Sequence, residues 1–240
     1  MELYRCDLVL HDYLFFATTE RGKVAETGPF IHNYALTYAL GWAVSPWHNE
    51  IQKPHYREEL ARVGKRYITP ARLVRGSYVV NQYNTMSESY SLGNKQQSIG
   101  YPDWGFVKCF RPGTMFRSYV VSAEAITFPR YLRLGKFMAK TELRIMVPQE
   151  LHLRTAPSTG REMRAKQPEY PLLAWDDLAM TARPVVFDII ANALPGHLIA
   201  NPVFDDVPGS YLVATFAHEE VPVQIPLRMG YYGENLCEFW

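Results

Sequence analysis

Four basic residues fall within one short span of the chain, and their spacing could serve phosphate binding. Arg130, Arg133, Lys136 and Lys140 surround Gly135, which permits a close approach of the backbone. A glycine between basic residues can bind phosphate through backbone N–H groups and the neighbouring charges. The chain contains no GxxxxGK[ST] and no GxGxxG sequence, so nothing argues for a nucleotide cofactor. We expect these four residues to contact the phosphates of a polyanion.

A second candidate site lies near the start of the chain. The alternating run from Leu3 to His11 predicts a strand, and the run from Phe30 to Gly41 predicts a short, mostly buried helix. A polar loop with glycines lies between them. Unpaired N–H groups and the helix dipole collect where such a helix begins, so this corner could attract an anion. The residues of the corner that we expect to bind RNA are Arg21, Lys23, His32, Asn33 and Tyr34.

The histidine of this corner could also do chemistry. Cleavage of RNA without a metal needs a base near the 2′-OH, an acid for the leaving oxygen and a cation for the phosphorane. His32, Tyr34 and either Lys23 or Lys136 could supply these groups. The alternative is a histidine at a helix start that hydrogen-bonds backbone or RNA without chemistry. We favour this alternative, and therefore expect no catalytic residue and no enzyme.

Metal and cofactor chemistry have little support in the sequence. The histidines form no HxxxH or HxH pair, and Cys6, Cys109 and Cys237 lie far apart without a CxxC pairing. We expect no metal site and no cofactor, and the lone thiols argue for a reducing compartment. The N-terminus has no signal-peptide pattern, and no window is apolar enough to span a bilayer. The expectation is a cytoplasmic protein without a membrane contact.

The net charge of +1 hides a strong segregation of charge along the 240 residues. Residues 53–166 hold 20 Lys and Arg against eight Asp and Glu. Residues 1–52 hold three basic and six acidic residues, and residues 167–240 hold two basic and ten acidic residues. A basic middle between acidic ends is typical of a polyanion-binding segment on an otherwise neutral scaffold. The alternative is a solvated surface whose charges happen to segregate.

The basic middle contains a predicted arm, residues 71–122. Strand-like runs at Leu73–Val80 and Trp104–Arg111 flank a long polar stretch, residues 81–102, and a further strand is expected at Thr114–Val121. This pattern predicts a long protruding β-hairpin, a thumb, with a polar tip. Basic side chains, which neutralise phosphates, alternate there with aromatic rings, which can stack on bases. The basic residues of this arm that we expect to contact RNA are Arg72, Arg75, Lys108, Arg111 and Arg117.

The acidic last third, residues 167–240, reads as a β-rich part that packs on the core. Tyr211–Ala217 predicts a strand, and Val221–Leu227 alternates but carries prolines that favour a sheet edge. Its acidic balance suits contact with protein rather than RNA.

Five segments, spread over nearly the whole chain, carry a resemblance to a known family. They resemble, in the family's order, the fifth-numbered Cas subunit of type I-D CRISPR interference (Cascade) complexes. No single segment is a chemical signature, so the specificity lies in the set. The segments are Tyr4–Glu20, Gly22–Gly41, Tyr131–Leu143, Val185–Asp205 and Val221–Tyr232.

The resemblance implies a fold and a role. Members of that family have an α+β, ferredoxin-like (RRM-related) core with a protruding hairpin, here a single unit over residues 1–240. They hold the 5′ handle of the crRNA and cap the repeated backbone Cas subunits. In most subtypes they do not cut RNA. The implied partners are crRNA, the repeated backbone subunits, the large Cas-ten-like subunit and target double-stranded DNA next to the protospacer.

Two other functions stay open on the sequence alone. In type I-C relatives the equivalent subunit processes precursor crRNA, so the chain could be a metal-independent endoribonuclease. It could also be a docking scaffold whose basic residues meet an acidic protein and no nucleic acid. Salt-dependent RNA binding by the pure protein would distinguish an RNA-binding subunit from a protein-docking scaffold. Guide-length product from repeat RNA in EDTA would distinguish an endoribonuclease from a non-catalytic RNA-binding subunit.

Overall fold

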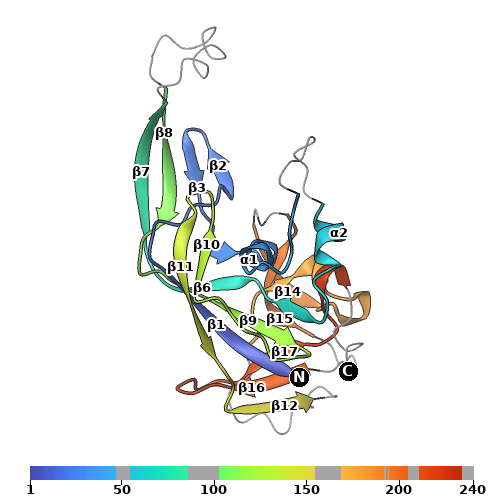
Figure 1. Ribbon diagram of the computed structural model, residues 1–240. Helices are drawn as coiled ribbons and strands as arrows, with labels where there is room; N and C mark the ends of the chain where they lie inside the picture. The colour runs from blue at the N-terminus through green and yellow to red at the C-terminus, as the bar shows by residue number, and fades with distance from the viewer. Residues whose placement is uncertain are drawn as a thin grey trace.

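The protein is described from a computed structural model that covers residues 1–46, 55–85, 103–154, 169–191, 193, 195–204 and 211–233. It is built mostly of β-strands, arranged around one strongly curled antiparallel sheet (Figure 1). This central sheet has the strand order β10-β11-β1-β9-β6-β4, and a further strand, β5, also pairs with β9. The strands are β1 (Glu2–Leu10), β4 (Phe30–Ile31), β5 (Arg66–Ile68), β6 (Ala71–Arg75), β9 (Met115–Ser122), β10 (Tyr131–Leu134) and β11 (Ala139–Met146).

Strand β1 lies in the interior of the sheet, and both of its faces are buried. It pairs antiparallel with β9 on one side and with β11 on the other. Cys6, Leu8 and Leu10 point into an apolar core on the side of helix α1. Leu3 points the other way, into a second core shared with the C-terminal part. The predicted strand from Leu3 to His11 is confirmed.

Two short α-helices lie on one side of the molecule, α1 (Asn33–Ala39) and α2 (Tyr56–Leu60). Helix α1 covers one face of the central sheet, and its Leu36 is fully buried in the core there. Its end was correctly predicted, since Gly41 follows the last turn with a φ of 70°.

A smaller sheet projects from the central one. It has the order β2-β3-β8-β7, and its long hairpin rises furthest from the body (Figure 1). The strands are β2 (Thr19–Arg21), β3 (Val24–Glu26), β7 (Tyr78–Thr85) and β8 (Asp103–Phe110). Of the expected arm, residues 71–122, only β7 and β8 project, because β6 and β9 belong to the central sheet. Residues 86–102, most of the expected polar tip, lie outside the described residues.

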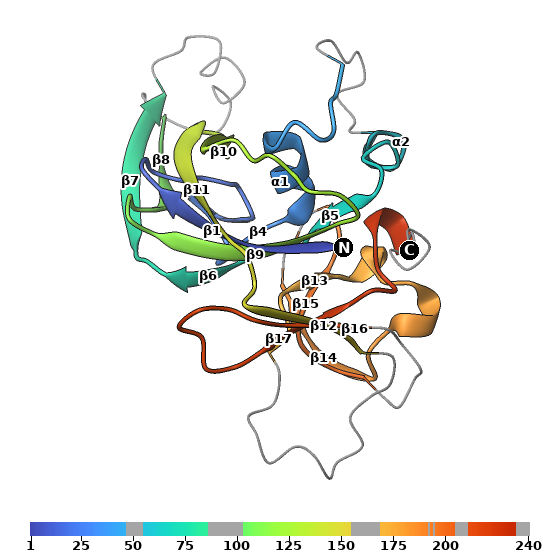
Figure 2. The ribbon, with the colours of Figure 1, turned by 60° about the horizontal axis from the view of Figure 1, so that its bottom comes forward.

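The C-terminal part packs against the outer face of the central sheet, below it in Figure 2. It holds two three-stranded sheets, β12-β16-β17 and β13-β15-β14. It also holds three 3-10 turns: η1 (Trp175–Asp177) and η2 (Met180–Ala182) lie between β13 and β14, and η3 (Tyr231–Gly233) follows β17. The strands are β12 (Glu150–Arg154), β13 (Leu173–Ala174), β14 (Val186–Ile190), β15 (Leu198–Val203), β16 (Tyr211–Thr215) and β17 (Val223–Pro226).

The expected α+β, ferredoxin-like (RRM-related) core is wrong. That fold packs two helices on one face of a four-stranded sheet, and here the described chain has a single seven-residue helix on that face. The stretch between β9 and β10, residues 123–130, contains no helix and ends on Pro129 and Arg130. It is too short to hold a helix that crosses the sheet and returns. Among the residues that the structure describes, no helix is long and apolar enough to cross a membrane.

Candidate nucleic-acid interface

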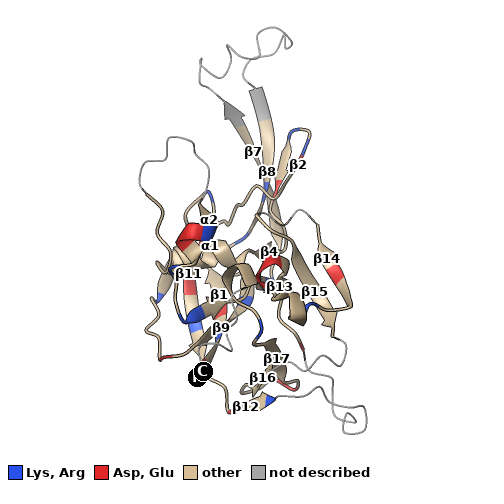
Figure 3. Cartoon of the chain, turned by 90° about the vertical axis from the view of Figure 1, so that its right-hand side faces the viewer, with Lys and Arg blue, Asp and Glu red and all other residues tan. Residues whose placement is uncertain are grey.

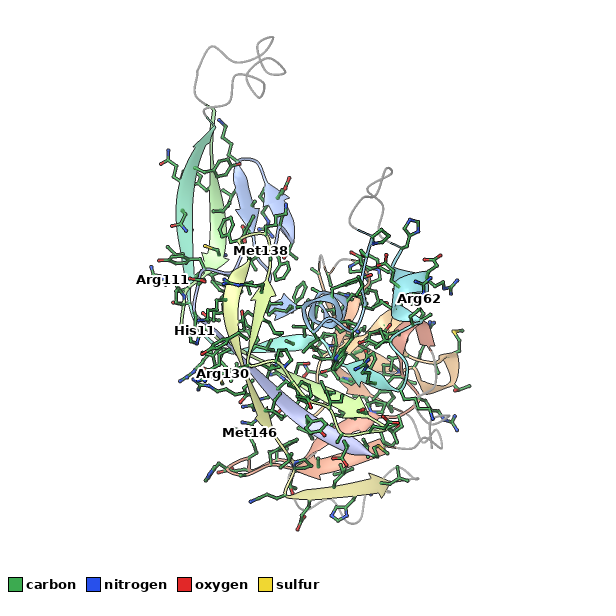
Figure 4. The ribbon with its side chains drawn as sticks, viewed as in Figure 1. His11, Arg62, Arg111, Arg130, Met138 and Met146 are labelled. Carbon is green, nitrogen blue, oxygen red and sulfur yellow. The ribbon has the colours of Figure 1, made fainter. Side chains whose placement is uncertain are left out.

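Five of the eleven lysines and arginines in the predicted set lie on or beside one surface, the exposed part of the outer face of the central sheet. Residues that are directly paired across strands point to the same side. Lys140 is paired with Arg133 across β11 and β10, and Arg75 is paired with Met115 across β6 and β9. Met115 points away from the core, because the next residue of β9, Phe116, is buried in it. Figure 4 shows Arg111, His11 and Arg130 along the same side of the molecule. We call this surface the basic sheet face; its cations are Arg75, Arg111, Arg130, Arg133, Lys140 and Arg144.

An exposed tyrosine lies in the middle of the basic sheet face. The Lys140 ammonium is 4.3 Å from the Tyr131 ring centroid, and the Arg130 guanidinium is 5.3 Å from it. His11 meets the same ring edge-to-face at 5.9 Å. A ring held by cations in this way presents a stacking surface beside positive charge.

Two carboxylates partly neutralise the positive charge of the basic sheet face. Glu142 lies 2.9 Å from Arg144, and the hydrogen bonds from Arg144 lower the pKa of Glu142. Asp12 lies 3.9 Å from Arg133. The side chains of Arg144 and Arg133 are more than half exposed, so these pairs hold the cations only weakly and leave them available to a phosphate. Figure 3 shows the basic segments along β1, β9 and β11 and an acidic segment on β14.

Two arginines of the predicted set are already engaged within the protein. Arg117 donates to Asp7 at 2.8 Å and to Glu219 at 2.9 Å, and its side chain is 20% exposed. Arg72 donates to Glu169 at 2.7 Å, with both side chains about half exposed. Arg117 therefore joins the central sheet to the C-terminal part, whereas the Arg72 pair stays open to solvent.

The predicted residues of the projecting sheet lie apart from the basic sheet face. Arg21 and Lys23 are exposed on the β2–β3 hairpin. Lys108 lies 3.2 Å from Glu26 and 4.6 Å from the Tyr78 ring centroid, so its charge is partly neutralised.

The start of α1 does not offer an open anion site. Asn33 is fully buried and donates to Asp177 at 2.7 Å. Tyr34 donates to the other oxygen of Asp177 at 3.0 Å, and Tyr67 and the Tyr232 N–H complete the set of donors. Burial raises the pKa of Asp177 to about 6 in spite of these hydrogen bonds. The anion at this corner is therefore the protein's own carboxyl group, and Asn33 has a structural role.

His32 is also buried, and its imidazole caps the helix. Its Nδ1 accepts the Tyr34 N–H at 3.3 Å, so the neutral ring carries its proton on Nε2. Burial lowers the pKa of His32 to about 4, against the opposing effect of the Gly196 backbone. Burial raises the pKa of Tyr34 well above its usual value.

Gly135 is needed for a different close approach from the one expected. Its φ is 69°, and a Cβ there would lie 2.5 Å from the carbonyl oxygen of Phe15. The same oxygen accepts the Lys136 N–H at 2.8 Å. The glycine therefore lets the β10–β11 turn pack on the chain after β1, and its neighbour Lys136 is left exposed.

The structure brings His32, Tyr34 and Lys136 together in a groove between α1 and the β10–β11 turn. Two adjoining hollows of about 260 and 420 Å³ share Phe16, Ala35, Tyr38 and Lys136 as lining residues. We call them together the aromatic groove. Its other lining side chains include Phe30, His32, Tyr34, Tyr56 and Arg133.

Some of these residues were not among the predicted RNA contacts, although Arg144 falls in the same basic span of the sequence as Lys140. Tyr131 and Arg144 belong to the basic sheet face, and the alternation of buried and exposed residues in β11 could have placed Arg144 beside Lys140. Nothing local marks Phe16, Tyr38 and Tyr56 as neighbours, because they come from three separate segments. Within the described ranges, no three metal-ligating side chains of His, Cys, Asp or Glu gather at one place.

The fold and this surface define a class: a β-rich protein with a curled sheet, a projecting hairpin and a basic face that carries an aromatic ring. The sequence model of one family, described as type I-D CRISPR-associated protein Cas5/Csc1, matches residues 1–234. A search of the curated proteins finds no match. The chain belongs to the Cas5/Csc1 family of type I-D CRISPR-associated proteins. This confirms the resemblance and gives the protein a role with the Cascade components of that system.

Proposed function

We propose that the protein is a non-catalytic RNA-binding subunit of a type I-D Cascade complex, which holds the 5′ handle of the crRNA and caps the repeated backbone subunits. The basic sheet face carries this proposal. Six cations on neighbouring strands and turns, with the Tyr131 ring among them, offer charge for phosphates and a ring for a base. Family membership supports the partners, since Cascade components assemble on a guide RNA.

The acidic C-terminal part supports a second contact, with protein. β14 is an edge strand, and large apolar side chains on it and beside it are more than half exposed. Val186 and Val203 face each other across β14 and β15, and Val185 and Ile189 lie close by in the chain. An exposed apolar edge next to acidic residues fits a neighbouring subunit better than RNA. The large Cas-ten-like subunit and the backbone subunits are the expected partners, and target double-stranded DNA is a further one.

The endoribonuclease alternative has one observation in its favour. His32, Tyr34 and Lys136 line the same groove, as that mechanism requires. Their acid–base properties argue against it. A histidine with a pKa of about 4 is a weak base and is almost never protonated at neutral pH, and the Tyr34 phenol is a still poorer acid.

One experiment tests the proposal against both alternatives. The purified protein is incubated with labelled repeat RNA, in EDTA and in Mg²⁺, over a range of salt concentrations. We expect stoichiometric, salt-dependent binding and no cleavage. Guide-length product that His32→Ala abolishes would establish the enzyme, and binding that is absent at low salt would leave only the protein scaffold.

A further inference from the structure

The aromatic groove lies on the opposite side of the central sheet from the basic sheet face, and the proposed function does not use it. Its walls are chemically distinctive. The rings of Phe16, Phe30, Tyr34, Tyr38 and Tyr56 line it together with the cations Lys136 and Arg133. Among the residues that the structure describes, no Asp or Glu lines either hollow. Rings and cations without a carboxylate suit a ligand that is flat, largely apolar and attached to negative charge.

The rings are held in place before any ligand arrives. The Tyr38 hydroxyl donates to Glu59, which also accepts from Ser45 at 2.7 Å. The Tyr56 ring centroid lies 5.5 Å from that of Tyr34 and 6.1 Å from that of Tyr38. A ligand that enters the groove therefore does not have to order these side chains, which lowers the cost of binding.

The topology links the groove to the basic sheet face. β10 is the edge strand of the central sheet, so no further strand separates the two sides there. Arg133 projects from β10 with Lys140 on the basic sheet face, and it also lines the groove. Lys136 follows on the turn and lines both hollows. A strand bound on the basic sheet face can thus pass over β10 along a line of cations and reach the groove.

We propose that the aromatic groove holds one unstacked base of the RNA that lies on the basic sheet face, with Lys136 and Arg133 at its flanking phosphates. The inference rests on the proposed function and names the nucleotide contact that it leaves open. The smaller hollow, of about 260 Å³, has room for a planar ring system between Tyr34, Tyr38 and Tyr56. The site would fix the position of the RNA along the protein by one inserted base.

The test is an abasic scan of single-stranded RNA with the repeat-derived handle sequence, measured by fluorescence anisotropy with the full-length protein. Each base is removed in turn. We expect two sensitive positions in the wild-type protein, the base in the groove and the base that stacks on Tyr131, each costing about tenfold in affinity, as is typical of a stacked base. Two variants change the groove in opposite ways: Tyr38→Leu removes a ring, and Ala35→Phe fills the space without removing a contact. In both, one of the two positions should become insensitive, and it should be the same position in both variants.

Tyr131→Leu is the matched control, since it removes a ring from the basic sheet face. It should weaken binding and abolish the cost of the other sensitive position, while the position lost in the two groove variants keeps its cost. A scan that is the same in Ala35→Phe, in Tyr38→Leu and in the wild type would overturn the inference and leave the proposed function intact. Failure of the wild type to bind RNA in a salt-dependent way would overturn the proposed function, and this inference with it.

Discussion

The Nε atom of Arg117 on β9 lies 2.8 Å from the carboxylate of Asp7 on β1. Asp7 is almost fully buried and also accepts from Arg5 at 2.9 Å. Both arginines reach Glu219, which lies in the loop between β16 and β17. This network of four charges ties the central sheet to the C-terminal part. Arg117, one of the predicted RNA-binding residues, therefore has a structural role between the central sheet and the C-terminal part.

The network predicts a loss of stability when Arg117 is removed. Arg117→Ala leaves a buried carboxylate with only Arg5, and should lower the free energy of unfolding by about 1–3 kcal/mol. Arg75→Ala, on the exposed end of the same face, is the control and should change it by no more than about 0.5 kcal/mol. Urea denaturation monitored by tryptophan fluorescence measures both. Equal stability of the two variants would contradict the structural role.

The basic sheet face predicts a change in the salt dependence of RNA binding. Arg130→Ala combined with Lys140→Ala removes two phosphate contacts, so the slope of log K against log salt should fall by about 1.4 for a single strand. Arg62→Ala combined with Lys65→Ala removes the same charge from another part of the surface (Figure 4). This control should leave the slope as it is in the wild type. A similar fall in both double variants would show that only net charge matters.

The buried carboxyl group of Asp177 predicts a dependence of stability on pH. Its pKa is about 6 in the folded protein and has the ordinary value of 3.8 in the unfolded chain. The folded state therefore binds the proton more tightly than the unfolded state. Stability from this group is therefore greatest below pH 4, and is lost as the pH rises to about 6. The loss is of the order of 3 kcal/mol.

Asp177→Asn tests this dependence, because the amide keeps the shape of the side chain and does not titrate. The difference in unfolding free energy between the variant and the wild type should shift in favour of the variant from pH 4 to pH 6.5. Chemical denaturation at several pH values measures this difference. A difference that stays constant over that range would mean that Asp177 titrates normally.

The close contact at Gly135 predicts that this glycine cannot be replaced. Gly135→Ala adds a Cβ at 2.5 Å from the Phe15 carbonyl oxygen, on top of the cost of a positive φ. Gly22 also has a positive φ, 61°, but nothing lies within 4 Å of its Cβ position. Gly22→Ala should therefore cost about 1 kcal/mol, and Gly135→Ala clearly more. Thermal unfolding of the two variants measures the difference, and equal melting temperatures would contradict it.

Sequence reasoning was reliable where the information is local. The alternation from Leu3 to His11 predicted β1, Gly41 marked the end of α1, and the run Trp104–Arg111 predicted β8. The run Leu73–Val80 is instead divided between β6 of the central sheet and β7 of the projecting sheet. The five matching segments also indicated the family correctly. Strand alternation, glycine conformation and family motifs depend on neighbouring residues, so the chain alone carries them.

Local reasoning failed where the result depends on distant segments. The ferredoxin-like expectation assumed a second helix, although residues 123–130 are too few to form one that crosses the sheet. Asn33 was expected to bind RNA, yet Asp177, far away in the chain, takes its amide. Arg117 and Arg130 look alike in sequence, but the first is partly buried and pairs with Asp7, whereas the second lies open beside Tyr131. The sequence by itself determined the strand β1, the end of α1, the family and the total of basic charge. Only tertiary structure decided which cations face solvent and which rings meet in the aromatic groove, because burial and pairing are set by the segments that pack against each residue.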